Sequence, residues 1–239
     1  MPVSLTFDVE EDCPPYLTST RGMEEGLPRI LDLLAERGIR GTFFFTARMA
    51  LKYPRLVRRV LEEGHELGCH AYDHERLDQL PRERAAELIR QALEVLRGFG
   101  EVISFRAPNL QLPRNLLPVL RENGILVDSS RAVYKGHWRV SREEGILELP
   151  VSVTSSVLRL PWSLQKPLHL FLREPRIYFA HPWEFVPIKG VRLDCRFHTG
   201  NTALRLLARL IDFYRQRKTP FLLLRDYLRL YPSSDPHRA

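Results

Sequence analysis

The chain has 239 residues, of which 44% are hydrophobic and 27% charged, and it carries a formal net charge of +7. This composition is typical of a folded protein and excludes a largely disordered chain. The positive charge is mostly arginine, but it forms no dense basic run and no interleaved aromatic platform, so the sequence predicts no nucleic-acid partner.

The three cysteines are Cys13, Cys69 and Cys195. Because they are odd in number and widely spaced, they indicate neither a disulfide framework nor a zinc ribbon, which fits a reducing compartment. The apolar run within residues 1–8 is too short for a signal peptide or a membrane span. We therefore expect a cytoplasmic protein without a membrane partner, and the sequence leaves the oligomeric state open.

The first half of the chain alternates apolar runs with amphipathic segments. Residues 3–7 are predicted to form a buried strand with acidic side chains at its end. Further strands are predicted over residues 41–46, 65–68 and 102–105, and helices over residues 26–38, 54–63 and 81–98. The apolar strands between amphipathic helices are expected to be parallel and covered on both faces.

The second half follows the same alternation, except that glycines and prolines break the pattern over residues 132–173. Within that region we predict one strand over residues 146–153 and loops elsewhere. The other predictions are helices over residues 113–123 and 202–217 and strands over residues 125–128, 177–180 and 220–224. The alternation predicts an α/β fold, with one β/α barrel domain over residues 1–231 and a frayed polar tail over residues 232–239.

Polar side chains suited to catalysis follow several of the predicted strands. The carboxyl ends of the strands in a parallel barrel all face the same side, so residues far apart in sequence meet there. The candidates brought together in this way are Asp8, Glu10, His70, His74, Arg106 and His181.

Two of these candidates, His70 and His74, have a spacing that suits a metal ion. Residues four apart lie on one face of a helical turn, and neutral imidazoles bind divalent ions such as zinc. A hydrolytic site also needs a third protein ligand, and spacing alone does not choose between Glu10, Glu11 and Asp12. The alternative interpretation is a pair of histidines on a solvated turn.

The order of these motifs resembles that of the polysaccharide deacetylase family, carbohydrate esterase family four. The matching segments are residues 5–10, 41–44, 64–70 with His74, 105–108 and 178–181. The run Gly64-His65-Glu66 that leads to the histidine pair is the most specific of them. The resemblance implies a distorted, seven-stranded β/α barrel and a divalent-metal-dependent hydrolase that removes an N-acetyl group from a sugar.

The resemblance also implies a role for each candidate. Asp8 corresponds to the general base that takes a proton from the attacking water, and Arg106 to the arginine that holds this carboxylate. His70 and His74 correspond to the metal-binding pair. His181 corresponds to the general acid that protonates the leaving amine.

The sequence departs from the family pattern at several positions. Val9 stands where most members have a second aspartate, and we assign the third metal ligand to Glu10, as in members that place it one residue later. Asn109 replaces a tyrosine whose backbone amide contacts the oxyanion, a role that asparagine can keep. Phe179 replaces a leucine before the catalytic histidine, and Trp183 is a candidate wall of the acetyl pocket or platform for a sugar face.

The expected cofactor is a divalent metal ion, with zinc preferred and cobalt, nickel and manganese as alternatives. The expected partner is an N-acetylated sugar, oligosaccharide or polysaccharide. Two other functions stay open: hydrolysis of another linear amide or ureide, and a catalytically impaired carbohydrate-binding barrel. A thiol nucleophile at Cys69 is not expected, because the barrel would place this residue on the opposite side from His70 and a buried, inert cysteine is far commoner.

Overall fold

The computed structural model describes residues 2–232. In this part of the chain the strands are β1 (Val3–Val9), β2 (Thr42–Phe45), β3 (Glu66–Cys69), β4 (Ser104–Phe105), β5 (Val127–Asp128), β6 (Ser141–Glu143), β7 (Ile146–Glu148) and β8 (Arg176–Ala180). The α-helices are α1 (Leu27–Glu36), α2 (Ala47–Lys52), α3 (Pro54–Glu62), α4 (Arg82–Arg97), α5 (Leu117–Glu122), α6 (Trp162–Phe171), α7 (Leu193–Arg196), α8 (Asn201–Gln216) and α9 (Tyr227–Leu230).

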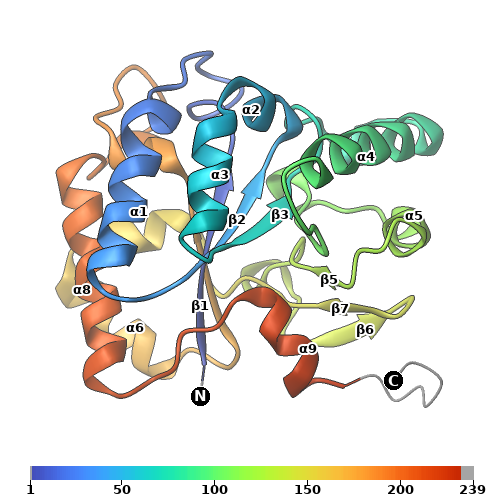
Figure 1. Cartoon of the computed structure of the whole chain (residues 1–239). Coiled ribbons are helices and arrows are strands. Elements are labelled where there is room, and N and C mark those ends of the chain that lie inside the picture. The colour runs from blue at the N-terminus through green and yellow to red at the C-terminus, as the bar shows by residue number, and fades with distance from the viewer. Residues whose placement is uncertain (1, 233–239) are drawn as a thin grey trace.

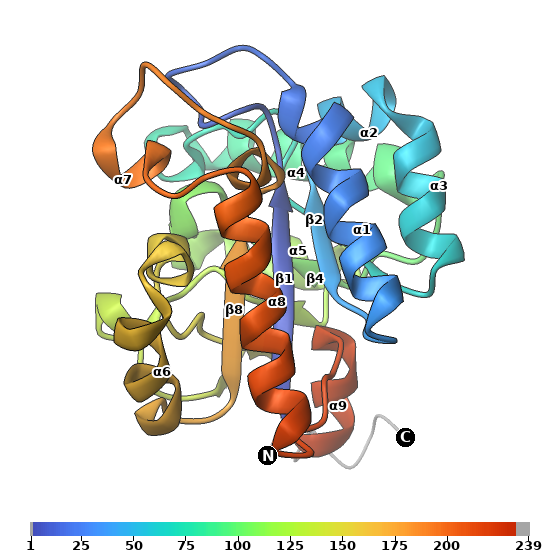
Figure 2. The same ribbon diagram turned by 90° about the vertical axis from the view of Figure 1, so that its left-hand side faces the viewer.

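The strands form one curled sheet in the order β6-β7-β5-β4-β3-β2-β1-β8. All neighbours are parallel except β6 and β7. The two ends of the sheet meet beyond β7, where Ser152 N donates to Ile177 O at 2.8 Å and Ser152 Oγ accepts from Ile177 N at 2.9 Å. Helices cover the outside of the curled sheet (Figures 1 and 2). The predicted distorted β/α barrel is thus confirmed.

Strand β1 is buried along its whole length, between β2 and β8. Its side chains alternate between two faces, as in any strand. Val3, Leu5 and Phe7 join the apolar core. The residues between them are polar: Ser4 Oγ donates to Leu222 O at 2.7 Å, and Thr6 Oγ1 donates to Tyr178 O at 2.7 Å. The strand therefore presents a polar row that leads to Asp8 at its carboxyl end.

The segment after α8 closes the amino-terminal end of the barrel. Leu224 N donates to Thr42 Oγ1 at 3.1 Å, and Arg225 N donates to Glu66 Oε2 at 3.1 Å. The prediction of a strand over residues 220–224 was wrong, because only Phe221 pairs, in a single bridge to Val3. Most of β1 is already occupied by β2 and β8, which leaves little edge for another strand.

Residues 132–173, predicted to be mostly loop, contain a helix and a second short strand. The predicted strand over residues 146–153 is shorter in the structure, where β7 ends at Glu148 and pairs with β6. Helix α6 escaped prediction because it buries Gln165 and His169 and exposes leucines, so its apolar pattern is reversed. The predicted polar tail lies outside the described residues from position 233 onward.

Asp128 and Glu148 form a buried acidic pair between neighbouring strands. They are opposite each other in the β5–β7 register and are 1% and 3% exposed. Asp128 Oδ2 and Glu148 Oε1 accept no hydrogen bond from the described residues. Burial and the adjacent Asp128 carboxyl raise the pKa of Glu148 well above its usual value. The folded state therefore resists ionisation of both carboxyl groups of the pair.

This pair predicts a pH-dependent contribution to stability. In the unfolded chain Glu148 ionises near pH 4.5, whereas the folded protein resists ionisation, so stability falls as the pH rises above that value. The loss amounts to about 1.4 kcal/mol for each pH unit between the two pKa values. Glu148→Gln removes this titration, and denaturant unfolding at several pH values should show a flatter profile for the variant. Parallel profiles would contradict the assignment.

Candidate active site

A cleft of about 520 Å³ lies at the carboxyl ends of the strands. The predicted candidates that line it are Asp8, Glu10, His70, His74 and His181. The sixth candidate, Arg106, is fully buried beneath the cleft and contacts Asp8. The barrel thus brings together the six side chains that the sequence predicted, although they come from four separate strand ends.

Glu10, His70 and His74 form a compact group at the floor of the cleft. Glu10 Oε2 lies 2.9 Å from His74 Nε2 and 3.4 Å from His70 Nε2. One donor atom from each residue lies within 4.8 Å of the others, so the three side chains could hold a metal ion. Glu10 Oε2 is buried but accepts no hydrogen bond from the described residues, as expected of a ligand oxygen.

The two histidines reach this group from a turn, not from a helical turn as predicted. Ala71 and His74 have φ angles of 62° and 59°, in the left-handed region, so residues 70–74 are non-helical. His70 Nδ1 donates to Arg106 O at 2.7 Å. This bond places the proton on Nδ1 and leaves the lone pair of Nε2 directed at Glu10.

The structure also separates Glu10 from the two neighbouring acids that the sequence left open. Asp12 is a structural residue: its carboxylate accepts hydrogen bonds from Ser19 Oγ and from the backbone of Arg21 and Gly22. Glu11 does not line the cleft; it lines an adjoining pocket, which shares His74 with the cleft. Burial alone would raise the pKa of Glu10, but the imidazoles of His74 and His181 outweigh it and hold this pKa well below its usual value.

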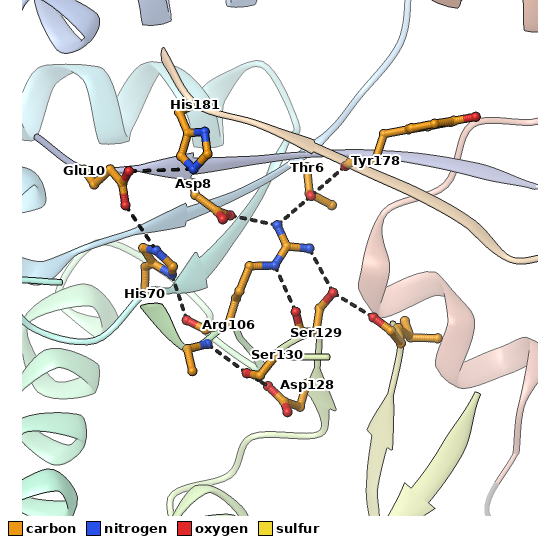
Figure 3. A network of polar contacts seen from close by, with 12 residues as sticks. Thr6, Asp8, Glu10, His70, Arg106, Asp128, Ser129, Ser130, Tyr178 and His181 are labelled. Atoms are coloured by element: carbon orange, nitrogen blue, oxygen red, sulfur yellow. Dashed lines mark hydrogen bonds and ion pairs between the residues drawn. The ribbon is translucent and has the colours of Figure 1, made fainter. Parts of the chain in front are cut away.

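Asp8 is held by a buried guanidinium. Arg106 Nη1 donates to Asp8 Oδ1 at 2.7 Å and to Thr6 Oγ1 at 2.7 Å. Arg106 also donates to Ser129 O at 3.0 Å and to Ser129 Oγ at 2.8 Å (Figure 3). Because the guanidinium is fixed at these points, it fixes the direction of the Asp8 carboxylate.

His181 lies near Glu10 Oε1, whereas His70 and His74 lie near Glu10 Oε2. It belongs to a chain of charged side chains that was not predicted from the sequence. Its Nδ1 lies 2.7 Å from Glu184 Oε1, and Glu184 Oε2 lies 2.9 Å from Arg159 Nε. Burial would lower the pKa of His181, but Glu10 and Glu184 outweigh it and raise this pKa to about 9. The three-residue interval from His181 to Glu184 was visible, but their contact depends on the 3₁₀ turn Pro182–Phe185.

The same turn brings Trp183 to the metal-binding group. Its indole Nε1 donates to Glu10 Oε1 at 3.3 Å, and its ring stacks on His181 with centroids 4.8 Å apart. Glu10 therefore has one oxygen held by the indole and the other facing the two histidines. Trp183 is 5% exposed and lines the cleft, so it forms part of the wall, as predicted, and also supports Glu10.

Removal of the indole donor should loosen Glu10. We expect Trp183→Phe to weaken metal binding roughly tenfold, because partners that orient a ligand typically have effects of that order. Competition with a chromophoric chelator measures the change. Trp162→Phe is the matched control, since Trp162 is the first residue of α6 and packs on His169 and Phe213. Equal metal affinities for the two variants would remove this role from Trp183.

Three other residues singled out from the sequence are Asn109, Phe179 and Cys69, and the structure shows the surroundings of each. Asn109 lines the cleft with a φ of 58°, and Phe179 forms part of the wall beside His181. Cys69 is fully buried in the apolar core, and burial raises the pKa of its thiol to about 12. A buried thiol in this state is not a nucleophile, in agreement with the interpretation of Cys69 as structural.

The sequence is similar to a known protein family and to several known proteins. The family model described as polysaccharide deacetylase matches residues 1–127. The peptidoglycan-N-acetylmuramic acid deacetylase PdaA of Bacillus subtilis is 28% identical over 141 residues, covering 54% of this chain and 51% of its own length. The chitooligosaccharide deacetylase of Azorhizobium caulinodans is 31% identical over 136 residues, covering 55% of this chain and 64% of its own length. The chain thus spans about half to two thirds of these relatives.

Solved structures resemble the whole barrel. The family 4 carbohydrate esterase from Streptomyces lividans, in complex with acetate, superposes with a TM-score of 0.63 at 18% identity, covering 92% of this chain and 91% of the other. BA3943 from Bacillus anthracis, described as a CE4 family pseudoenzyme, superposes with a TM-score of 0.66 at 15% identity. The match covers 95% of this chain and 65% of the other. Identities this low establish the shared fold alone, so function must be argued from the site residues.

Proposed function

Because the chain belongs to the polysaccharide deacetylase family, we propose that it is a metal-dependent hydrolase that removes an N-acetyl group from an amino sugar in an oligosaccharide or polysaccharide. The observation that carries the proposal is the grouping of Glu10, His70 and His74 between Asp8 and His181 in one cleft. This arrangement supplies a metal site with a carboxylate on one side and an imidazole on the other.

The donor set fits a divalent metal ion. Two imidazole nitrogens and one carboxylate oxygen are the ligands that zinc takes in hydrolytic sites, and cobalt, nickel and manganese accept them as well. The buried Glu10 Oε2 lacks a hydrogen-bond donor, and the His70 tautomer leaves Nε2 free to coordinate. A divalent ion held there would polarise the acetyl carbonyl and make the attacking water more acidic. We propose zinc as the ion.

Asp8 would act as the general base. Arg106 binds its Oδ1, and the carboxylate lines the cleft, so it can accept the proton of the attacking water. The bond to Arg106 keeps this carboxylate oriented, because the guanidinium is itself fixed by its bonds to Thr6 and Ser129. Asp8 and Glu10 therefore have different tasks, although both belong to the first strand or its end.

His181 would act as the general acid. Its Nδ1 donates to Glu184 Oε1, and because its pKa is raised to about 9 the ring is protonated on both nitrogens at neutral pH, so Nε2 also carries a proton, on the side that faces Glu10 Oε1, 3.7 Å away. A proton at this position can pass to the nitrogen of the leaving amine as the C–N bond breaks. Glu184 is a positioning residue, since it orients the imidazole without reaching the cleft floor.

Two alternative functions remain distinct from this proposal. The same residues could hydrolyse a ureide or another linear amide, because the attack on an amide carbonyl is the same. The second alternative is a barrel that binds carbohydrate without catalysis. It is suggested by Val9 and Asn109, where the sequence departs from the family pattern. An enzyme is favoured over a binding-only barrel, because the side chains expected for catalysis and metal binding lie within ion-pair distance of one another. They are Asp8, Glu10, His70, His74, Arg106 and His181.

Acetate release from N-acetylglucosamine oligomers tests the proposal. The purified protein should bind one equivalent of divalent metal, release acetate, lose this activity in EDTA and regain it on addition of zinc. Bound metal without acetate release, but with release of ammonia or amine from ureides, would favour the other hydrolase. Acetate release that persists in EDTA would contradict the mechanism.

A further inference from the structure

Helix α6 (Trp162–Phe171) has its polar and apolar sides reversed. Its buried residues are Gln165 and His169. Its outer side chains are apolar and open to solvent: Leu164 is 62% exposed and Phe171 83% exposed. A helix on the surface of a folded protein normally buries its apolar side, so the outer face of α6 requires an explanation of its own.

The inner side of α6 is firmly anchored by hydrogen bonds. Gln165 Nε2 donates to Leu158 O at 3.0 Å and to Leu160 O at 2.6 Å. His169 Nδ1 lies 2.9 Å from the Tyr178 hydroxyl, which in turn lies 2.7 Å from the Tyr214 hydroxyl. Because the buried polar groups have partners, the orientation of the helix is fixed and its apolar side must face outward.

The exposed apolar residues form a continuous row. Leu164, Leu168 and Phe171 are spaced by four and three residues, which places them on one side of a helix. Pro167 lies between them on the same side. Scattered exposed leucines need no explanation, but an apolar row of this kind on one element marks an interaction site. We call this row, from Leu164 to Phe171, the α6 apolar face.

Positive charge lies to one side of the α6 apolar face, toward α8, because Lys166 is two residues from both Leu164 and Leu168 and lines the groove between the two helices. Residues 161–173 contain Lys166 and Arg173 and no acid. Helix α8 lies beside α6 (Figure 2) and adds the exposed Arg205 and Arg209. A groove of about 500 Å³ between the two helices is lined by Trp162, Lys166, Arg209 and Arg217, with one acid, Asp212, which pairs with Arg37 at 3.3 Å.

We propose that the α6 apolar face docks on an anionic lipid membrane. An apolar row flanked by lysine and arginine matches the boundary between acyl chains and negatively charged headgroups. A second copy of the chain fits less well, because a symmetric contact would bring the same cations together. No described helix has the length and apolarity to cross a bilayer, so the contact is peripheral. The proposal revises the expectation of no membrane partner and does not depend on the reaction.

Cosedimentation with lipid vesicles tests the proposal. The full chain should bind vesicles of equal parts phosphatidylcholine and phosphatidylglycerol, bind phosphatidylcholine vesicles weakly, and lose binding as salt is added. The triple variant Leu164→Ser, Leu168→Ser, Phe171→Ser should lower the partition coefficient at least roughly tenfold. Lys166→Gln with Arg173→Gln should remove the preference for phosphatidylglycerol. Leu51→Ser is the matched control, since Leu51 is a 54% exposed leucine on α2.

Three outcomes would overturn the proposal. They are equal binding of both vesicle types, binding that the triple variant retains, and a lipid-free dimer in analytical ultracentrifugation that Phe171→Ser abolishes. The last outcome would identify a second copy as the occupant. Each substituted side chain is exposed, and unchanged metal binding shows that a variant is folded. Vesicle binding is measured without substrate, so its failure is distinct from failure of the deacetylase proposal.

Discussion

Replacement of Asp8 by asparagine is expected to lower kcat for acetate release by about two to four orders of magnitude, the usual contribution of a general base. Asparagine has nearly the same shape and can still accept the hydrogen bond from Arg106, which lies 2.7 Å from Asp8 Oδ1. It cannot accept a proton from water. The variant should therefore keep its fold and its substrate affinity while losing turnover.

The control for Asp8→Asn is the metal content of the purified variant. Asp8 is not among the three residues that could hold the ion, so the variant should keep one equivalent. Steady-state kinetics with a metal-loaded protein then isolates the proton transfer. Loss of both metal and activity would show that Asp8 is a ligand, and a kcat close to that of the wild type would show that another group is the base.

Replacement of Glu10 by alanine is expected to have the largest effect on the metal. The change removes one of the three donor groups and leaves His70 and His74, which together are too few protein ligands for a stable hydrolytic site. The protein should lose its metal on dialysis, and acetate release should fall with it. Elemental analysis of the dialysed variant measures the loss.

Glu11→Ala is the matched control for this experiment. Glu11 is the next acid in the sequence, but it is not one of the three residues whose donor atoms come together, so its removal should leave one equivalent of metal in place. Thermal unfolding of Glu10→Ala should show a folded protein, because loss of Glu10 also relieves the burial of a charge. Stoichiometric metal in Glu10→Ala would exclude this residue as the third ligand.

The sequence predicted the site well because strand ends have a simple geometry. Asp8, Glu10 and His181 each follow an apolar strand, and parallel strands bring such residues to one edge. The pairing of His70 and His74 was also predicted, but through a helical turn that does not exist. Their imidazoles converge because Ala71 adopts a left-handed backbone angle, which no residue spacing reveals.

The features that the sequence did not predict depend on contacts between distant segments. Arg159 and Glu184 are 25 residues apart in the numbering, and their ion pair at 2.9 Å forms only when the barrel closes. Trp183 lines the cleft as predicted, but the bond from its indole N–H to Glu10 was not foreseen. Helix α6 was missed because buried Gln165 and His169 replace the expected apolar stripe.

The pairing of β1 with both β2 and β8 also constrains the order in which the barrel can assemble. This strand is made first, yet one of its sheet neighbours, β8, comes from residues 176–180, and its bridge partner Phe221 comes later still. During synthesis the edge of β1 that β8 will cover stays open until most of the chain has left the ribosome. An open apolar strand edge can pair with other chains. Aggregation during expression should therefore depend on how fast the second half of the chain is delivered.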